Sequence, residues 1–423
     1  MHNTHDVIAA RPSRQGQDGT SDSFHHPLRD PDLSTAIPSA GRMDRTGASI
    51  SAGQRMKAVL VAIHRLGRLR LDEKILLSDL CRDPRDLENL SAADLVACTG
   101  RERSAEEWHP SRAIALAVAD LELFDRMGIA YIHYDDLRYP PLLRETAVPP
   151  FGLFVRGRLP DPDKPHAALV GTRSPTGSGL SAASSLASDL ARAGIPVVSG
   201  LALGIDSAAH RGALSVNGYT LAVLPCGIDR IYPPSNRGLA ARILDSGGGL
   251  ASEYPPGAGI HKYRFPERNR IIAGISRACV VVEAPAISGA LITAEHALSE
   301  GRDVWVHSAC AGGPRNAGAD NLAGEGACVL SGAGELLRDW GMPLPSRTGG
   351  RTGRNAPGNS DGQIEGEALG QALRLELGLE SGLGAARGSD TFAMKPRSCG
   401  EAAGLRRRTP ALPELSKDQE TYR

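Results

Sequence analysis

The chain has 423 residues, which is enough for two or three domains. A hydrophobic content of 41% with 49 glycines and 29 prolines predicts a globular centre flanked by disordered ends. The formal net charge is zero, so any site for a polyanion must be a local patch rather than a property of the whole chain.

Several classes of protein are disfavoured by what the sequence lacks. Its seven cysteines occur singly, without a CxxC pair, which argues against a structural zinc site. Scattered cysteines with apolar neighbours predict reduced thiols in a cytoplasmic protein. The chain has no run of about 18 apolar residues and no apolar segment near its start, so we expect neither a membrane span nor secretion. We expect no metal and no cofactor.

Composition and periodicity divide the chain into five parts. Polar, aperiodic ends predict a disordered N-terminal extension and a low-complexity tail with one short helical candidate at residues 366–380. Apolar residues spaced i, i+3, i+4 and i+7 predict a small helical domain of the SAM or helix-hairpin-helix type. Pro-Pro pairs predict an extended connector after it. The parts are residues 1–52 (extension), 53–130 (helical domain), 131–165 (connector), 166–340 (α/β domain) and 341–423 (tail).

Residues 166–340 alternate short apolar runs with helical patterns. Strands are predicted in AALVG, IPVVSG, YTLAVLPCG, GLASEYPP, RACVVVEAP and RDVWVHS, with helices between several of them. Alternating strands and helices predict a Rossmann-like, doubly wound and mostly parallel sheet in an α/β domain. Nearly continuous Val, Ile and Leu in the strands fit a sheet that is covered on both faces.

Three strand-to-helix turns at one edge of this sheet combine glycines with hydroxyl side chains. Backbone N–H groups at helix N-termini bind anions, and glycines let a phosphate approach the backbone. A row of such turns suits a chain of phosphates, although each turn alone is equally consistent with a helix cap. The predicted contacts in these turns are Gly171, Thr172, Arg173 and Ser174; Ser199, Gly200, Gly204, Ile205 and Asp206; and Ser288, Gly289 and Thr293. Arg173 discriminates between the two readings, because a plain turn does not need an arginine; its alternative role is a surface salt bridge.

Two carboxylates near this edge raise the question of catalysis. Asp206 precedes a helix, so it either caps that helix or closes its loop through backbone N–H groups. His210 is four residues further on, and an orienting hydrogen bond to Asp206 is favoured over a hydrolase pair because no nucleophile stands at a fixed spacing. Glu283 is either a catalytic carboxylate or a helix cap.

A basic stretch, YRFPERNRIIAG, precedes the VVVEA strand. We expect it to form a helix or turn near the same edge, where arginines would make a neutral chain locally basic toward phosphates. The alternative is an ion pair to Glu253 or Glu283, which we expect for one of the arginines. The predicted nucleic-acid contacts here are Arg264, Arg268, Asn269 and Arg270, with Asn236 as a base or sugar contact beside a stacking Tyr232.

Several long motifs resemble one family. SGLALGIDSAAHRGAL, AVLPCGIDRIYPPSN, SEYPPG, FPERNRIIAGIS and VVVEAPAISGALITAEHAL are similar to segments of the DprA/Smf family, and the likeness covers residues 55–340. The resemblance implies a non-enzymatic, cytoplasmic homodimer that binds single-stranded DNA and loads RecA onto it, as in natural transformation. It also implies phosphate contacts by Arg173 and by the SGLALGID turn. Some members of the family have a basic residue at the position of Leu203, so the phosphate contact implied there is weakened in this chain.

One alternative function is left open by the residues. Rossmann-like enzymes of the nucleotide phosphoribohydrolase type use a glutamate beside a PGGxGT loop. The nearest stretch here, CAGGPRNAG, has no such glutamate. The family's frequent C-terminal winged helix is not recognisable in residues 341–423.

Overall fold

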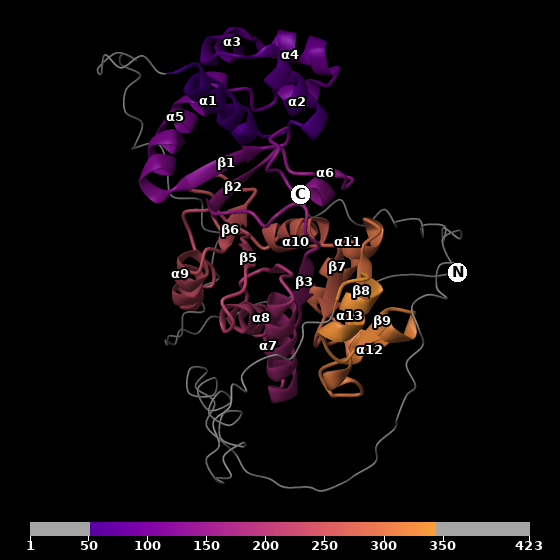
Figure 1. Cartoon of the computed structure of the whole chain (residues 1–423). Helices are drawn as coiled ribbons and strands as arrows, with labels where there is room; N and C mark the ends of the chain where they lie inside the picture. The colour runs from indigo at the N-terminus through magenta and orange to yellow at the C-terminus, as the bar shows by residue number, and fades with distance from the viewer. Residues whose placement is uncertain (1–50, 344–423) are drawn as a thin grey trace, which may run out of the picture. The chain divides into compact units, whose positions relative to one another are not determined.

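A computed structural model describes residues 51–343 of the protein (Figure 1). The predicted N-terminal extension and tail, including the helical candidate at residues 366–380, lie outside the described residues except at positions 51–52 and 341–343. In the described part, no helix has both the length and the apolar character that a membrane crossing needs.

The first part is helical, as the periodicity predicts. Ser91 caps one helix through its side chain, and Gly100 ends the same helix in the left-handed conformation with φ of 67°; serine and glycine are the residue types that such caps favour. The helices are α1 (Ala52–Arg65), α2 (Leu71–Leu80), α3 (Pro84–Asn89), α4 (Ala92–Thr99), the 3-10 turn η2 (Glu102–Ala105) and α5 (Pro110–Met127).

The predicted extended connector is wrong in one respect, because it contributes to the sheet. It contains most of β1 (Ile129–His133), which begins two residues before it, the one-turn helix α6 (Pro141–Arg144) and β2 (Gly152–Gly157). β1 pairs antiparallel with β2, and β2 pairs antiparallel with β6. The Pro-Pro pairs do exclude a long helix, but the apolar run behind the second pair is buried and forms β2, which lies between β1 and β6.

The remaining strands form the predicted parallel sheet. The nine strands lie in the order β1-β2-β6-β5-β4-β3-β7-β8-β9, and all pairs from β6 to β9 are parallel. The further strands are β3 (Ala167–Val170), β4 (Val197–Ser199), β5 (Thr220–Val223), β6 (Gly249–Ser252), β7 (Ala278–Val281), β8 (Asp303–His307) and β9 (Cys328–Leu330). The helices are α7 (Gly177–Arg192), α8 (Ile205–Leu214), α9 (Arg237–Asp245), α10 (Arg264–Ile275), α11 (Gly289–Ser299), α12 (Ala317–Gly324) and α13 (Ala333–Asp339), with 3-10 turns η3 (Pro234–Asn236) and η4 (Ser308–Cys310).

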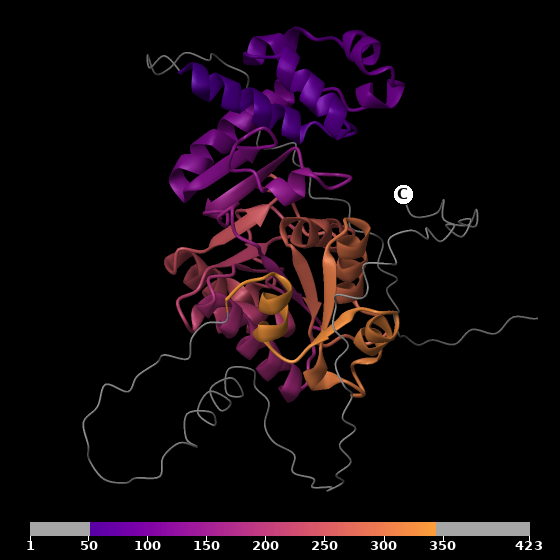
Figure 2. The same ribbon diagram turned by 45° about the vertical axis from the view of Figure 1, so that its right-hand side comes forward.

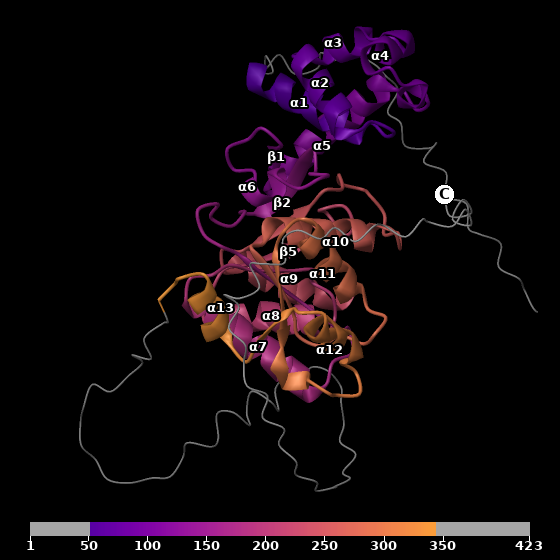
Figure 3. The same ribbon diagram turned by 90° about the vertical axis from the view of Figure 1, so that its right-hand side faces the viewer.

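Helices cover both faces of this sheet (Figures 2 and 3). One face packs against α10, α11 and α12, and the other packs against α7, α8 and α13. Successive strand residues belong to opposite layers: Val197 faces the second layer and Val198 the first. The alternation explains why the strands read as continuous apolar runs.

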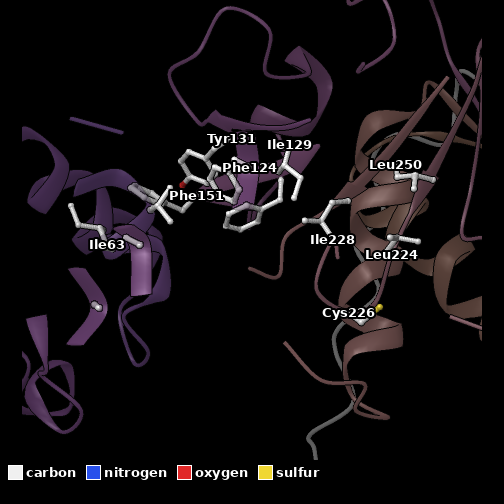
Figure 4. Close-up of a cluster of buried hydrophobic side chains, with 14 of the residues drawn as sticks. Ile63, Phe124, Ile129, Tyr131, Phe151, Leu224, Cys226, Ile228 and Leu250 are labelled. Carbon is white, nitrogen blue, oxygen red and sulfur yellow. The ribbon is translucent and has the colours of Figure 1, made fainter. Parts of the chain in front are cut away.

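A third apolar cluster joins the helical domain to the sheet (Figure 4). Phe124 of α5 packs on Phe154 of β2 with ring centroids 5.7 Å apart. A buried ion pair reinforces the junction: Arg65 donates two hydrogen bonds to Asp120, at 2.6 and 2.7 Å, and a third to the carbonyl of Pro256. The helical domain is therefore fixed on the loop that follows β6.

Close packing of α7 against α8 depends on one glycine. A Cβ at Gly212 would meet the backbone of Ser184 on the facing helix, and a backbone cannot move aside cheaply. We predict that Gly212→Ala lowers the free energy of unfolding by about 1–3 kcal/mol through overpacking. Urea denaturation measures the change.

Gly238 of α9 provides the matched control, since a Cβ there has nothing within 4 Å. Gly238→Ala should leave stability unchanged or raise it by up to about 1 kcal/mol, because alanine favours helix. Equal effects of the two substitutions would contradict the packing argument.

Candidate nucleic-acid interface

The site lies where the strand order reverses. β3, the first strand of the parallel part, lies between β4 and β7, so the chain proceeds outward in both directions from it. Ligands of doubly wound sheets bind outside the carboxyl ends of the strands at such a switch point. A cleft of about 290 Å³ opens there, between the β3–α7 loop, the β7–α11 loop and the first turns of α10 and α11.

The β3–α7 loop is fixed by hydrogen bonds to both of its neighbours. The Thr172 N–H donates to the carbonyl of Glu283 at 2.8 Å, and the Thr172 carbonyl accepts from the N–H of Ile205 at 3.2 Å. Gly204 has φ of 77°, and a Cβ there would meet the carbonyls of Thr172 and Arg173, so only glycine fits. Gly204 is therefore required because the β3–α7 loop and the β4–α8 loop approach each other closely at this point.

Arg173 is the exposed cation at the mouth of this cleft. Its guanidinium lies over the ring of Phe265, 5.1 Å from the centroid, and it also borders an adjoining hollow of about 60 Å³. Stacking on an aromatic face orients a guanidinium while leaving its N–H edges available for a phosphate. Phe265 was not singled out in the sequence, although an aromatic residue among arginines is a recognisable signal.

Asp206 closes its loop through backbone N–H groups, as one of the two readings predicted. It is buried, and its carboxylate accepts from the N–H groups of Gly200 at 3.1 Å and Ala202 at 3.3 Å. Burial raises the pKa of Asp206, and the nearby Arg268 guanidinium opposes that shift. The arrangement is that of a structural carboxylate rather than a catalytic one.

His210 does not make the predicted hydrogen bond to Asp206. Its Nδ1 instead lies 2.7 Å from the hydroxyl of Thr220 on β5, and the side chain is fully buried. The spacing i, i+4 does put both residues on one side of α8, but the carboxylate turns back to its own loop while the imidazole turns to the sheet. His210 therefore supports the α8–β5 packing from inside.

Arg268 is internal too, although the sequence placed its charge at the surface. It is 4% exposed and donates to the carbonyls of Gly200 and Val223 and to Oδ1 of Asn269. Burial lowers its pKa to about 10, while Asp206 favours the charged form, so it carries its proton at neutral pH. Its guanidinium holds the β4–α8 and β5 loops together and forms part of the cleft wall.

The other two arginines of α10 are engaged as well. Arg270 forms the expected ion pair with Glu253 and also donates to the carbonyl of Val148. Arg264 is half-buried, stacks on Tyr254 and donates to the carbonyl of Gly259. The prediction that three arginines would make the edge basic is therefore too simple, because hydrogen bonds within the protein orient all three.

The β7–α11 turn forms the opposite wall of the cleft. Ser288 caps α11, and its hydroxyl accepts from the N–H of Ala290 at 3.3 Å. Asn269 donates to the carbonyl of Gly289 at 3.1 Å, which ties this turn to α10. Ile287, which the sequence reasoning missed, is 96% exposed beside it. An α-helix of 11 residues thus starts at the cleft with its partial positive charge.

Glu283 is a helix cap, one of the two roles that the sequence left open for it. The side chain is buried, and its Oε2 accepts from the backbone N–H and the hydroxyl of Thr176, the N-cap of α7, at 2.9 and 3.0 Å. A Cβ at Gly179 would occupy the same space.

The predicted contacts thus divide into two groups. A first set surrounds the cleft: Gly171, Thr172, Arg173, Asp206, Arg268, Asn269, Ser288, Gly289 and Thr293. Ser174 is exposed nearby, and its carbonyl accepts from Arg315 of the β8–α12 loop. A second set does not line it. Ser199, Ile205, His210 and Asn236 are buried, Gly200 borders the adjoining hollow, and Gly204, Arg264 and Arg270 lie outside the lining of the cleft. Asn236 donates to the Leu201 carbonyl and to the Ser207 hydroxyl, and Tyr232 packs edge-on against Phe265.

The fold and the cleft define a Rossmann-like α/β protein with strand-to-helix turns that converge on one cleft. The family model described as DNA recombination-mediator protein A matches residues 130–341. The chain belongs to this family.

Curated relatives and a solved structure agree with the assignment to this family. The DNA processing protein DprA of Bacillus subtilis is 32% identical over 255 residues, which cover 60% of this chain and 82% of that one. The protein Smf of a Synechocystis strain is 42% identical over 225 residues, 52% of this chain and 56% of that one. The crystal structure of DprA from Streptococcus pneumoniae aligns with a TM-score of 0.53 and 30% identity, covering 69% of this chain and 98% of that one. The chain spans little more than half the length of some relatives, 54% for the Smf protein of Escherichia coli.

The buried His210 makes stability depend on pH. Burial, followed by the nearby Arg268 and Arg211, lowers its pKa to about 3. The ordinary histidine pKa is about 6.5, so below that pH the unfolded chain protonates this histidine while the folded protein keeps it neutral. The free energy of unfolding therefore falls as the pH falls from about 6.5 toward the folded-state pKa. We predict a loss of about 2 kcal/mol from this residue between pH 7.5 and pH 5.

Urea titrations of the wild type and His210→Gln at several pH values in this range measure the effect. The variant should be less stable at pH 7.5 but should lose less on acidification. His109→Gln is the control, because His109 is exposed, and it should retain the slope of the wild type. Equal slopes for all three proteins would show that His210 does not stay neutral.

Proposed function

We propose that this protein binds single-stranded DNA in the cleft at the β3–β7 switch point. The observation that carries the proposal is Arg173, an exposed guanidinium stacked on Phe265 at the cleft mouth. A pre-oriented arginine loses less conformational entropy on binding a phosphate than a free one does. The N-terminus of α11 on the opposite wall offers a second group for the same anion.

The cleft supports recognition of a backbone rather than of a base sequence. Its walls are the turns after β3 and β7, with their glycine and hydroxyl side chains, and residues of α10 and α11, which add apolar side chains such as Phe265 and Ile272. No helix in this arrangement is presented as one would be for reading a major groove, which favours a single strand over a duplex. Two groups that recognise phosphate by charge bind every sequence alike.

The wider role follows from family membership. We propose that the protein protects single-stranded DNA and helps to load RecA onto it, as in natural transformation, and that it acts as a homodimer in the cytoplasm. The family description as a recombination mediator supports this role. The enzymatic alternative has less support, because both carboxylates considered for catalysis are engaged in hydrogen bonds: Asp206 accepts from N–H groups of its own loop, and Glu283 accepts from Thr176 of the β3–α7 loop.

Arg173→Ala tests the proposal directly. We predict that the variant binds labelled oligo-dT about 10- to 100-fold more weakly, because a charge-assisted hydrogen bond to phosphate is lost. The slope of log affinity against log salt should also fall by about 0.7, the contribution of one phosphate on a single strand. Fluorescence anisotropy at a series of salt concentrations measures both quantities.

Arg112→Ala is the control for charge, since Arg112 is an exposed arginine on α5 in the helical domain. It should leave both affinity and salt slope unchanged. Failure of the wild type to bind oligo-dT at low salt would overturn the proposal.

Leu203 offers a test by gain of binding. It is 43% exposed beside Arg173 and Tyr232, in the turn where some family members have a basic residue. We predict that Leu203→Lys tightens oligo-dT binding several-fold and makes the salt slope steeper by about 0.7. Leu203→Met, which changes shape but adds no charge, should bind like the wild type. Unchanged affinity in the lysine variant would place the phosphates away from this turn.

A further inference from the structure

Four side chains before and at the start of α10 form a continuous stack. The guanidinium of Arg264 lies over two rings, 4.5 Å from the centroid of Tyr254 and 5.7 Å from that of Tyr263. The ring of Tyr263 stacks in turn on His261, with centroids 5.4 Å apart and planes 20° from parallel. We call these four residues the α10 stack.

The outer half of the α10 stack is exposed without an evident structural need. Tyr263 is 57% exposed, and His261 is exposed as well. Neither belongs to any of the three apolar clusters that make up the core of the described residues. Two flat rings held in parallel at the surface are a stacking surface for a third ring.

The inner half of the α10 stack is held in place by hydrogen bonds. The Tyr254 hydroxyl donates to Oε2 of Glu267 at 2.6 Å, and Arg264 donates to the carbonyl of Gly259. Burial, together with Glu267, raises the pKa of Tyr254, so the hydroxyl keeps its proton. The outer rings are therefore presented by a rigid base, which lowers the entropy lost when a ligand stacks on them.

The α10 stack lies within one helical turn of the DNA cleft. Pro266 lines the cleft and is three residues from Tyr263, so the two are neighbours on α10. Phe265 lies between them in sequence, and the guanidinium of Arg173 stacks on its ring. At the stack the charges of Arg264 and Glu267 offset each other, whereas Arg173 adds a positive charge at the cleft, so charge favours the phosphates in the cleft and the bases at the rings.

We propose that the α10 stack is a base-stacking platform for the single strand whose phosphates occupy the cleft. A nucleobase stacks on the exposed face of the His261–Tyr263 pair, and Arg264 strengthens the stack from below through its cation–π contacts. The inference rests on the proposed function, and adds to it a site for bases outside the cleft. Any base fits, since every base has a flat face.

The test compares two ligands of equal length and charge, oligo-dT and a chain of abasic residues. Tyr263→Ala should bind oligo-dT about fivefold or more weakly, the lower end of the loss for removing one stacked base. It should bind the abasic chain as tightly as the wild type does. Tyr263→Phe, which keeps the ring, should behave like the wild type with both ligands.

Two further measurements exclude an indirect effect. Leu298→Ala removes an apolar side chain of the same exposure, 57%, from the far end of α11, and should leave both affinities unchanged. An oligonucleotide carrying 2-aminopurine should lose fluorescence on binding the wild type and Tyr263→Phe, and should keep more of it with Tyr263→Ala.

The possible outcomes distinguish the stacking platform from the phosphate-binding cleft. An equal loss on both ligands in Tyr263→Ala, or no loss on oligo-dT, would overturn the platform while leaving the cleft proposal intact. If Arg173→Ala has no effect on the abasic chain while Tyr263→Ala still weakens oligo-dT, the cleft fails and a ring-based site alone remains. If the wild type binds neither ligand, both proposals fall.

Discussion

The cleft at the β3 switch point depends on the hydrogen bonds that the guanidinium of Arg268 donates. Three loops that are distant in sequence meet there, and its hydrogen bonds to the carbonyls of Gly200 and Val223 hold two of them against α10. A buried arginine is tolerated only when its donors are satisfied and a negative charge is near, and Asp206 supplies that charge. The same carboxylate binds the N–H groups of the turn that Arg268 holds by its carbonyl. One buried pair of opposite charges thus shapes both sides of a loop.

This constraint explains why Arg268, although it lines the cleft, is not free to bind a ligand. Three arginines act as internal connectors: Arg65 fixes the helical domain, Arg268 fixes the cleft and Arg270 fixes α10 to Glu253. Arg173 is different, because its guanidinium rests on the ring of Phe265 and the residue is exposed. A local site of this kind is compatible with a chain whose charges cancel overall.

Several turns that resemble phosphate sites serve first as caps. Glu283 and Thr176 complete the start of α7, and Ser288 completes the start of α11. Such satisfied caps keep the loops in one conformation, which is what a pre-organised binding edge requires. The proposed recognition of a single strand combines two kinds of chemistry, charge in the cleft and flat rings at α10, as is usual for proteins that bind single strands without reading sequence.

The sequence by itself determined the fold class, the six strands of the parallel sheet from β3 to β8, the caps at Ser91 and Gly100, and the edge at which the strand-to-helix turns meet. These follow from local periodicity and turn chemistry, which are written in neighbouring residues. Only the tertiary structure decided that the connector supplies β1 and β2, that His210 bonds to Thr220 and that Arg268 points inward. Those outcomes depend on partners far along the chain: Val223 is 45 residues from Arg268, and β2 pairs with a strand about a hundred residues away. Charge and spacing identify which residues are capable of a contact, whereas burial decides which of them face solvent.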